Sequence, residues 1–304
     1  MFRFHLIGLL LGTILDFIFG RLYGIWNPFD SIRKMVRFLD RALLGDKLVL
    51  LEPSKQKSLG GWMVAIVVLP VFLISTFFTL LCYDMAPWFG MLFEALATYF
   101  CLDFKKLCTD SQMIMNDYYG DGANAMKHTA FLVTGRELEG ESEEELSANA
   151  ITYIANEASD SVLSPLFVMF LFGPVGGFIY RTIDIIDSEV GYQNHRYEFF
   201  GSIPAKINRV VDYLPGRFAG ALTVFAARHT FGGFDGRNAR FIHLRDKCKA
   251  ISAFAGALNI ALKDKTVGDM DKEPQAKDIR VATRLLRNDY LLVQAILVIL
   301  LLIF

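Results

Sequence analysis

An uncharged block of 21 residues, from Trp62 to Cys82, constrains this chain more than any other feature of its sequence. A helix that crosses the hydrocarbon core of a bilayer needs about 20 apolar residues, so this block has the length of a transmembrane helix. Composition supports the same class, because 53% of the residues are hydrophobic and only 21% are charged, below the roughly 25% typical of soluble domains. We therefore predict an integral membrane protein.

Further apolar blocks accompany this one, at residues 6–19, 87–101, 162–180 and 291–304. The block at 162–180 contains Pro165 and the run Gly173-Pro174-Val175-Gly176-Gly177. Because proline and clustered glycines break helices, we expect a broken or re-entrant segment here, with an ordinary kinked helix as the alternative. A re-entrant segment would leave the polar stretches before and after it on one side of the membrane.

The distribution of basic residues predicts the orientation. Residues 21–60 hold eight lysines and arginines, whereas the link at 83–86 holds none. Because loops rich in lysine and arginine remain in the cytoplasm, we place residues 21–60 and 102–160 there. The expected location is the cytoplasmic membrane, with a multi-pass chain and a site that faces the cytoplasm.

The polar stretches show helix signals. Ser142 with Glu145 forms a capping box, and the stretch Gly120-Asp121-Gly122 is typical of a turn between two helices. Strand signals are scarce. We therefore predict an all-α, polytopic membrane protein in which residues 1–304 form a single membrane-embedded domain. Residues 102–160 and 181–250 would be cytoplasmic helical or loop regions that carry the functional site.

Charge and motifs exclude several function classes. The net charge is −1, which gives no basic face for a nucleic acid. The sequence has no phosphate-binding G-x-x-x-x-G-K-[ST] loop, no H-E-x-x-H motif and no G-x-S-x-G motif. The four cysteines form no C-x-x-C pair, and the five histidines lack metal-ligand spacing.

Acidic pairs are the strongest chemical signal. Glu157 and Asp160 stand three residues apart, as do Asp184 and Asp187, so each pair would share one face of a helix. Carboxylates on one face can hold Mg²⁺ that bridges phosphate oxygens, although a single pair is more often a solvated surface. Asp16 lies in an apolar block, where a charge is expensive. It would line a polar cavity or reach the membrane interface from a helix end.

Short stretches along the chain form an ordered set: Leu15–Gly20, Val133–Arg136, Ser159–Phe167, Tyr180-Arg181, Asp187-Ser188, Val190–Tyr192, Phe200-Gly201, Leu214–Arg217, Ala255–Ile260 and Thr266–Asp269. This set resembles the membrane-bound adenosylcobinamide-phosphate synthase (CbiB-like) family of cobalamin biosynthesis. The resemblance implies an enzyme that joins a corrinoid carboxylate to an amino-alcohol phosphate through an amide bond, with ATP as co-substrate and Mg²⁺ as cofactor.

Roles for single residues follow from the resemblance together with the acidic pairs. The expected catalytic residues are Glu157, Asp160 and Asp187. The expected Mg²⁺ ligands are Asp160, Asp184 and Asp187. The expected substrate-binding residues are Asp16, Arg136, Arg181 and Arg217, because arginine suits phosphate and carboxylate groups. The expected partners are the corrinoid, the amino-alcohol phosphate and the lipid bilayer, with a homo-oligomer as a possible state and no nucleic acid.

The chain departs from the family mainly at polar positions. It has Asn27-Pro28 where the family has His-Pro, and Asn208-Arg209 where the family has Asp-Asp. Asn156-Glu157 shows the family's Glu-Asn pair in reverse order. Two alternatives therefore stay open beside the synthase. One is a non-catalytic, AmpE-like membrane regulator or sensor on the same scaffold, and the other is a Mg²⁺-dependent membrane transferase for another phosphorylated substrate.

Overall fold

The computed structural model describes residues 2–22, 24–45, 51–134, 142–191, 195–236, 239, 249–262, 267–268 and 272–304. The helices are α1 (Phe2–Phe19), α2 (Pro28–Leu44), α3 (Pro53–Met85), α4 (Pro87–Cys101), α5 (Phe104–Asp121), α6 (Ala123–Thr134), α7 (Glu143–Ala158), the π-helix η1 (Ser159–Leu163), α8 (Ser164–Val190), α9 (Ser202–Val211), α10 (Pro215–His229), α11 (Lys249–Leu258) and α12 (Ala276–Ile303). Two short strands, β1 (Ala261–Leu262) and β2 (Val267–Gly268), pair antiparallel. The predicted all-α class is confirmed.

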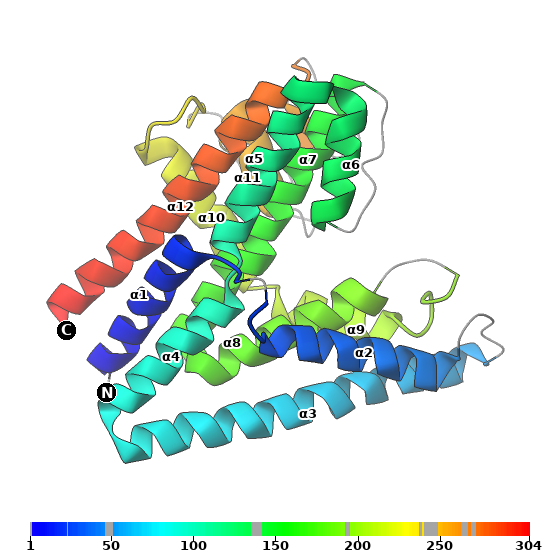
Figure 1. Cartoon of the computed structure of the whole chain (residues 1–304), viewed down its shortest axis with the longest axis vertical. Coiled ribbons are helices and arrows are strands. Elements are labelled where there is room, and N and C mark those ends of the chain that lie inside the picture. The colour runs from blue at the N-terminus through cyan, green and yellow to red at the C-terminus, as the bar shows by residue number, and fades with distance from the viewer. Residues whose placement is uncertain are drawn as a thin grey trace.

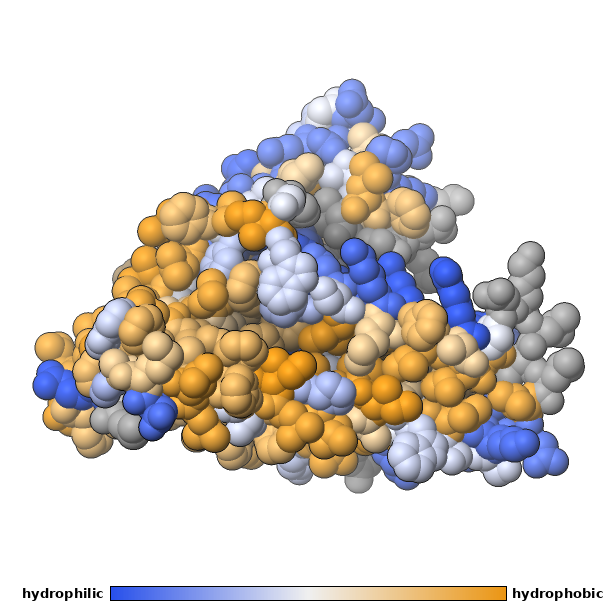
Figure 2. Space-filling view, turned by 60° about the horizontal axis from the view of Figure 1, so that its bottom comes forward, coloured by the Kyte–Doolittle hydropathy of each residue, from blue (hydrophilic) through white to orange (hydrophobic). Residues whose placement is uncertain are grey.

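The expected membrane character is confirmed as well. Among the residues that the structure describes, four helical stretches are long and apolar enough to cross a bilayer: Phe2–Phe19, Pro53–Met85, Glu143–Val190 and Ala276–Ile303. Large apolar side chains of α3 stand outside the packed interior, for example Leu69 and Leu73, each 57% exposed. Figure 2 shows the resulting apolar band across the lower part of the molecule, below a hydrophilic upper part.

Local signals set the helix ends. Proline occupies the first position of α2, α3 and α4, where its missing N–H costs nothing. Asn27 caps α2, and its side chain accepts a hydrogen bond from the Phe29 backbone N–H. The predicted cap of α7 is present, because the Ser142 side chain accepts from the Glu145 N–H. Gly122 ends α5 at a φ of 83°, as the predicted turn requires.

Helix α8 reverses its direction in the middle. Gly173 has a φ of 64° and a ψ of −160°, a conformation that essentially only glycine adopts. Arg181 Nη1 lies 3.0 Å from Oγ of Ser161, which stands 20 positions earlier in the chain. A straight helix would separate the backbones of these two residues by about 30 Å. Residues 164–173 and 174–190 are therefore the two arms of a re-entrant hairpin. The re-entrant alternative holds, and the stretch Glu143–Val190 does not cross the bilayer as one straight helix.

The described residues pack into two hydrophobic clusters. One joins α5, α6, α7, η1, α10, α11 and most of the buried face of α12. The other joins α1, α2, α3, α4 and the second arm of α8. Figure 1 shows the first group in the upper part of the molecule and α2, α3, α8 and α9 in the lower part. The ends of α1, α4 and the hairpin arms meet between the two groups.

Candidate functional site

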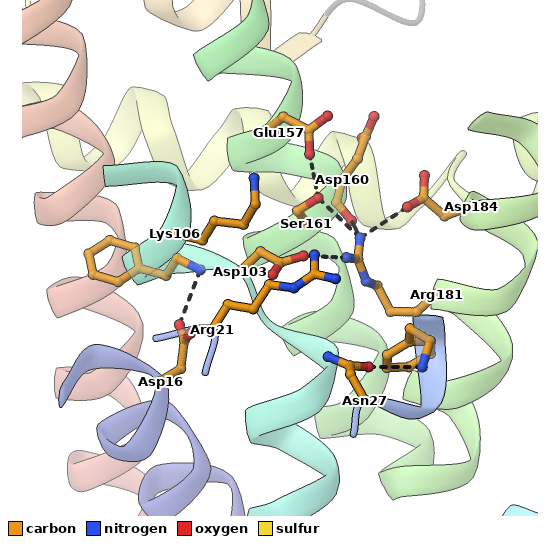
Figure 3. A network of polar contacts seen from close by, with 12 residues as sticks. Asp16, Arg21, Asn27, Asp103, Lys106, Glu157, Asp160, Ser161, Arg181 and Asp184 are labelled. Atoms are coloured by element: carbon orange, nitrogen blue, oxygen red, sulfur yellow. Dashed lines mark hydrogen bonds and ion pairs between the residues drawn. The ribbon is translucent and has the colours of Figure 1, made fainter. Parts of the chain in front are cut away.

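A buried arginine lies at the junction of the two clusters. Arg181, on the second hairpin arm, is 5% exposed. Its Nη2 donates to Asp103 Oδ2 at 2.7 Å, and its Nη1 donates to Asp184 Oδ2 at 3.0 Å. Nη1 also reaches Ser161 Oγ at 3.0 Å. We call Asp103, Ser161, Arg181 and Asp184 the Arg181 network, and Figure 3 shows its members converging from three parts of the chain.

The fold brings these residues together through short local features. Asp103 stands in the link between α4 and α5, and its N–H donates to the Ser161 carbonyl oxygen at 3.2 Å. Ser161 belongs to η1, a single-turn π-helix of the kind often found at functional sites. Asp184 follows Arg181 by three residues on one helix, so both side chains lie on the same face.

Acidic groups outnumber the buried cation. Glu157 Oε2 accepts a hydrogen bond from Ser161 Oγ at 2.5 Å. The carboxylates of Glu157, Asp184 and Asp212 are close enough to Asp160 to act on its charge. Because Arg181 is the guanidinium that bonds to this group, the described residues leave an excess of negative charge. A cationic ligand fits that excess.

Two further cations stand beside the network. Figure 3 shows Arg21 extending toward Asp103, and Lys106 lying next to Asp103 with its amine on the side of Glu157. Arg21 forms an ion pair with Asp30 at 2.5 Å, and Lys106 forms one with Asp110 at 2.5 Å. Burial raises the pKa of Asp110, and the charge of Lys106 partly opposes that rise. Positive charge is therefore present at the rim of the acidic group.

The predicted acidic pairs divide between different partners. Asp184 bonds to Arg181, whereas Asp187 Oδ2 accepts from Asn208 Nδ2 at 2.6 Å. Asp212, four residues after Asn208, accepts a hydrogen bond from the Tyr180 hydroxyl at 2.8 Å. The sequence spacing predicted that Asp184 and Asp187 share a helix face. In the structure their carboxylate oxygens bond to different partners, Arg181 and Asn208.

A magnesium site would use these oxygens. Within the ranges that the structure describes, no group of three or more His, Cys, Asp and Glu side chains is arranged to hold a metal ion. Mg²⁺ is commonly bound by one or two carboxylates, with waters and substrate phosphates completing its shell. The hard oxygens of Asp160 and Asp184, in an acidic excess, suit that manner of binding. The assignment of Asp160, Asp184 and Asp187 to Mg²⁺ stays a prediction.

Two of the remaining predicted site residues, Asp16 and Arg217, contact hydrogen-bond or ring partners outside the four residues of the Arg181 network. Asp16 is 1% exposed, and its Oδ2 accepts from the Phe104 N–H at 3.1 Å, next to the Tyr290 hydroxyl at 3.5 Å. It thereby ties the end of α1 to the start of α5. Arg217 stacks on the Tyr213 ring at 3.6 Å. Arg136 lies outside the described residues. Substrate contacts for all three stay predictions.

Asp103 and Ser161 were not among the residues assigned roles from the sequence. Asp103 stands two positions after the apolar block 87–101, and an acid just beyond the end of such a helix is a usable signal. Ser161 stands beside Asp160 in the sequence, but only the hairpin explains its contact with Arg181.

Comparison of the sequence with known proteins shows the family of this chain. The family model described as CobD/Cbib protein matches residues 9–287. Cobalamin biosynthesis protein CobD of Listeria monocytogenes serotype 4b (strain F2365) is 28% identical over 260 residues, covering 82% of this chain and 80% of that protein. The protein of the same name from Clostridium perfringens (strain 13 / Type A) is 24% identical over 294 residues, covering 90% and 91%. No solved structure matches the chain.

Proposed function

Since this chain belongs to the CobD/Cbib protein family and its relatives are cobalamin biosynthesis proteins, we propose that it is the enzyme that joins a corrinoid carboxylate to an amino-alcohol phosphate. The amide bond would form at the expense of ATP. The observation that carries the proposal is the Arg181 network, in which a buried guanidinium holds two carboxylates beside further acidic groups. Family membership supports the role in cobalamin biosynthesis, and the site supports the reaction.

The chemistry needs two steps. A carboxylate oxygen of the corrinoid attacks a phosphorus atom of ATP, which gives an acyl phosphate with ADP or an acyl adenylate with diphosphate. The amine nitrogen of the amino-alcohol phosphate, after loss of a proton from its ammonium form, then attacks the acyl carbon. The C–O bond breaks, and phosphate or AMP leaves with the former carboxylate oxygen. The site must therefore neutralise phosphate charge and accept protons from the amine.

The acidic residues match these needs. We assign Mg²⁺ binding to Asp160, Asp184 and Asp187, and the bound ion would neutralise negative charge on the nucleotide phosphates. Glu157 is half-buried beside Ser161, and we assign it the role of the base that receives the amine proton. Asp187 lies one helical turn beyond Asp184 on the second arm.

The basic residues act in two ways in this proposal. Arg181 has its Nη atoms occupied by Asp103, Asp184 and Ser161, so it holds the acidic groups in place as well as adding positive charge near the substrate. Arg21 and Lys106 stand at the rim, where a phosphate would arrive. Arg136, Arg217 and Asp16 complete the proposed substrate contacts. The basic stretch at residues 21–60 supports a site that opens to the cytoplasm.

A product assay tests the proposal. The full chain, purified in detergent, is incubated with a corrinoid acid, an amino-alcohol phosphate, ATP and Mg²⁺, and the products are analysed by mass spectrometry. We expect an amide whose formation requires ATP. If folded, monodisperse protein forms no amide with any amino-alcohol phosphate, the proposal fails. An AmpE-like regulator, or a Mg²⁺-dependent transferase for another phosphorylated substrate, would then be the better description.

A further inference from the structure

A second polar cluster lies within the apolar part of the molecule, near the N-terminal end of α1. Glu94 of α4 is 1% exposed. Its Oε1 lies 2.6 Å from His5 Nδ1, and its Oε2 accepts from the Tyr83 hydroxyl at 2.8 Å. We call His5, Tyr83 and Glu94 the clasp. A buried carboxylate among membrane helices is expensive and calls for a functional explanation.

The clasp reaches the re-entrant hairpin through a specific backbone group. In an unbroken helix, the carbonyl of Phe170 would accept from the N–H of residue 174. That residue is Pro174, which has no N–H, so the Phe170 carbonyl lacks the donor four residues on that an α-helix normally supplies. His5 Nε2 lies 3.1 Å from this oxygen and supplies the missing hydrogen bond. A carbonyl at the reversal of the hairpin is thereby fixed to α1.

The hydrogen bonds of the clasp determine how many protons it holds. Nε2 of His5 must carry a proton to donate to the Phe170 carbonyl. The short contact between His5 Nδ1 and Glu94 Oε1 then requires one further proton between these two atoms. Whichever atom carries that proton, the pair is neutral overall, and Glu94 Oε2 remains an acceptor for Tyr83. The clasp is therefore a set of hydrogen bonds that requires no net charge.

The clasp stands at the opposite end of the hairpin from the Arg181 network. A Cβ atom added at Gly173, the residue of reversal, would lie 3.9 Å from Glu94 Oε1. A Cβ atom added at Gly8 of α1 would come within 3.0 Å of Glu94 Cγ, so α1 and α4 approach closely here. From Gly173 the second arm runs as one helix through Arg181 and Asp184. The position at which this arm begins therefore sets the positions of the Arg181 and Asp184 side chains.

We propose that Glu94 is a positioning residue: through His5 and Tyr83 it fixes the reversal of the re-entrant hairpin, and thereby the placement of Arg181 and Asp184. This role rests on the proposed function for its effect on catalysis, but the effect on the hairpin is independent of it. Glu94→Ala leaves the His5 and Tyr83 groups without their partner. Glu94→Gln keeps both hydrogen bonds, because the amide nitrogen donates to His5 Nδ1 and the amide oxygen accepts from Tyr83.

The experiment compares Glu94→Ala, Glu94→Gln and Tyr83→Phe in full-length protein in lipid nanodiscs. The matched control is Ser75→Ala, which removes a buried hydroxyl that bonds only its own helix, at Phe72 O. Hydrogen–deuterium exchange is measured over residues 164–190, together with kcat and KM for amide formation. We expect Glu94→Ala to raise exchange at least about fivefold. We also expect it to lower kcat about tenfold at unchanged KM, whereas Glu94→Gln and Ser75→Ala behave as wild type.

Each result decides the proposal. Unchanged exchange in Glu94→Ala overturns the clasp, and raised exchange with unchanged kcat overturns its link to the site. If wild-type protein forms no amide, the proposed function fails, and exchange at residues 178–186 alone decides whether the clasp places Arg181. If Glu94→Ala does not fold, Tyr83→Phe, which removes one hydrogen bond, is read by the same criteria. Loss of activity in Glu94→Gln equal to that in Glu94→Ala would also contradict a hydrogen-bonding clasp.

Discussion

Ser161 Oγ and Arg181 Nη1 lie 3.0 Å apart, although 20 positions separate the two residues in the sequence. The contact exists because Gly173 reverses α8, which brings the middle of the second arm, at Arg181, back to η1. The same reversal places Asp184 within reach of Glu157 and Asp160. A single glycine conformation is thus the structural cause of the acidic site.

The first prediction concerns the geometry of Arg181. Arg181→Lys keeps the charge, but a lysine lacks the planar fork that bonds Asp103 and Asp184 at the same time. We expect about a tenfold lower rate of amide formation and a loss of roughly 1–3 kcal/mol of unfolding free energy, the cost of a lost buried hydrogen bond to a charged group. Thermal unfolding and product assays measure both. The control is Arg196→Lys, at an ion pair with Asp40 outside the site, and equal effects in the two variants would contradict the assignment.

The second prediction concerns metal dependence. Asp184→Asn and Asp160→Asn each remove one negative oxygen from the acidic group, so we expect the Mg²⁺ concentration at half-maximal activity to rise and kcat to fall about 100-fold. Titration of activity with Mg²⁺ measures both values. Asp40→Asn serves as the control. Full activity of both site variants, with an unchanged Mg²⁺ titration, would rule out the proposed ligands.

The third prediction concerns the reversal itself. Gly173→Ala places a Cβ atom at a backbone conformation that essentially only glycine adopts, and we expect a loss of about 1–3 kcal/mol with a parallel loss of activity. Gly120→Ala is the matched control, because a Cβ atom there meets nothing within 4 Å and φ is not positive. Thermal unfolding of both variants checks the difference. A Gly173→Ala protein as stable as wild type would show that the hairpin does not depend on this residue.

The fourth prediction concerns membrane sidedness. Because the hairpin returns to its starting level, residues before and after it must be accessible from the same side. In a chain with its cysteines replaced, we expect single cysteines at Glu144 and Glu198 to react with a membrane-impermeant maleimide from the cytoplasmic side. A cysteine at Met85, 62% exposed at the end of α3, should react from the other side. Labelling of positions 144 and 198 from opposite sides would contradict the re-entrant hairpin.

Sequence reasoning predicted the helical blocks well, because apolar length and local caps decide them. The start of α7 at Ser142 and the turn at Gly122 follow from local hydrogen bonding and backbone freedom alone. At 162–180 the glycine–proline run predicted a break but left the kinked helix and the re-entrant segment open. The direction after the break depends on packing against α3 and α4 and on the contact between Phe170 and His5, which no local pattern contains.

The site was predictable in composition but not in pairing. Acidic spacing pointed to Glu157, Asp160, Asp184 and Asp187, which the structure places on α7, on η1 and on the second arm of the hairpin. The expected contact of Arg181 with substrate stays a prediction, and the sequence did not show that its Nη atoms bond to protein oxygens. The pairing of Asp103 with Arg181, 78 positions away, could be found only once the hairpin and the α4–α5 link were placed together.

The most direct test follows an oxygen atom. A corrinoid acid labelled with ¹⁸O in its reacting carboxylate is incubated with the full-length protein, the amino-alcohol phosphate, ATP and Mg²⁺. If the carboxylate is activated by the nucleotide, each amide formed must release one ¹⁸O atom into phosphate or AMP, and mass spectrometry will find it there. Absence of the amide, or an amide formed with no ¹⁸O in phosphate or AMP, would contradict ATP-dependent activation at this site.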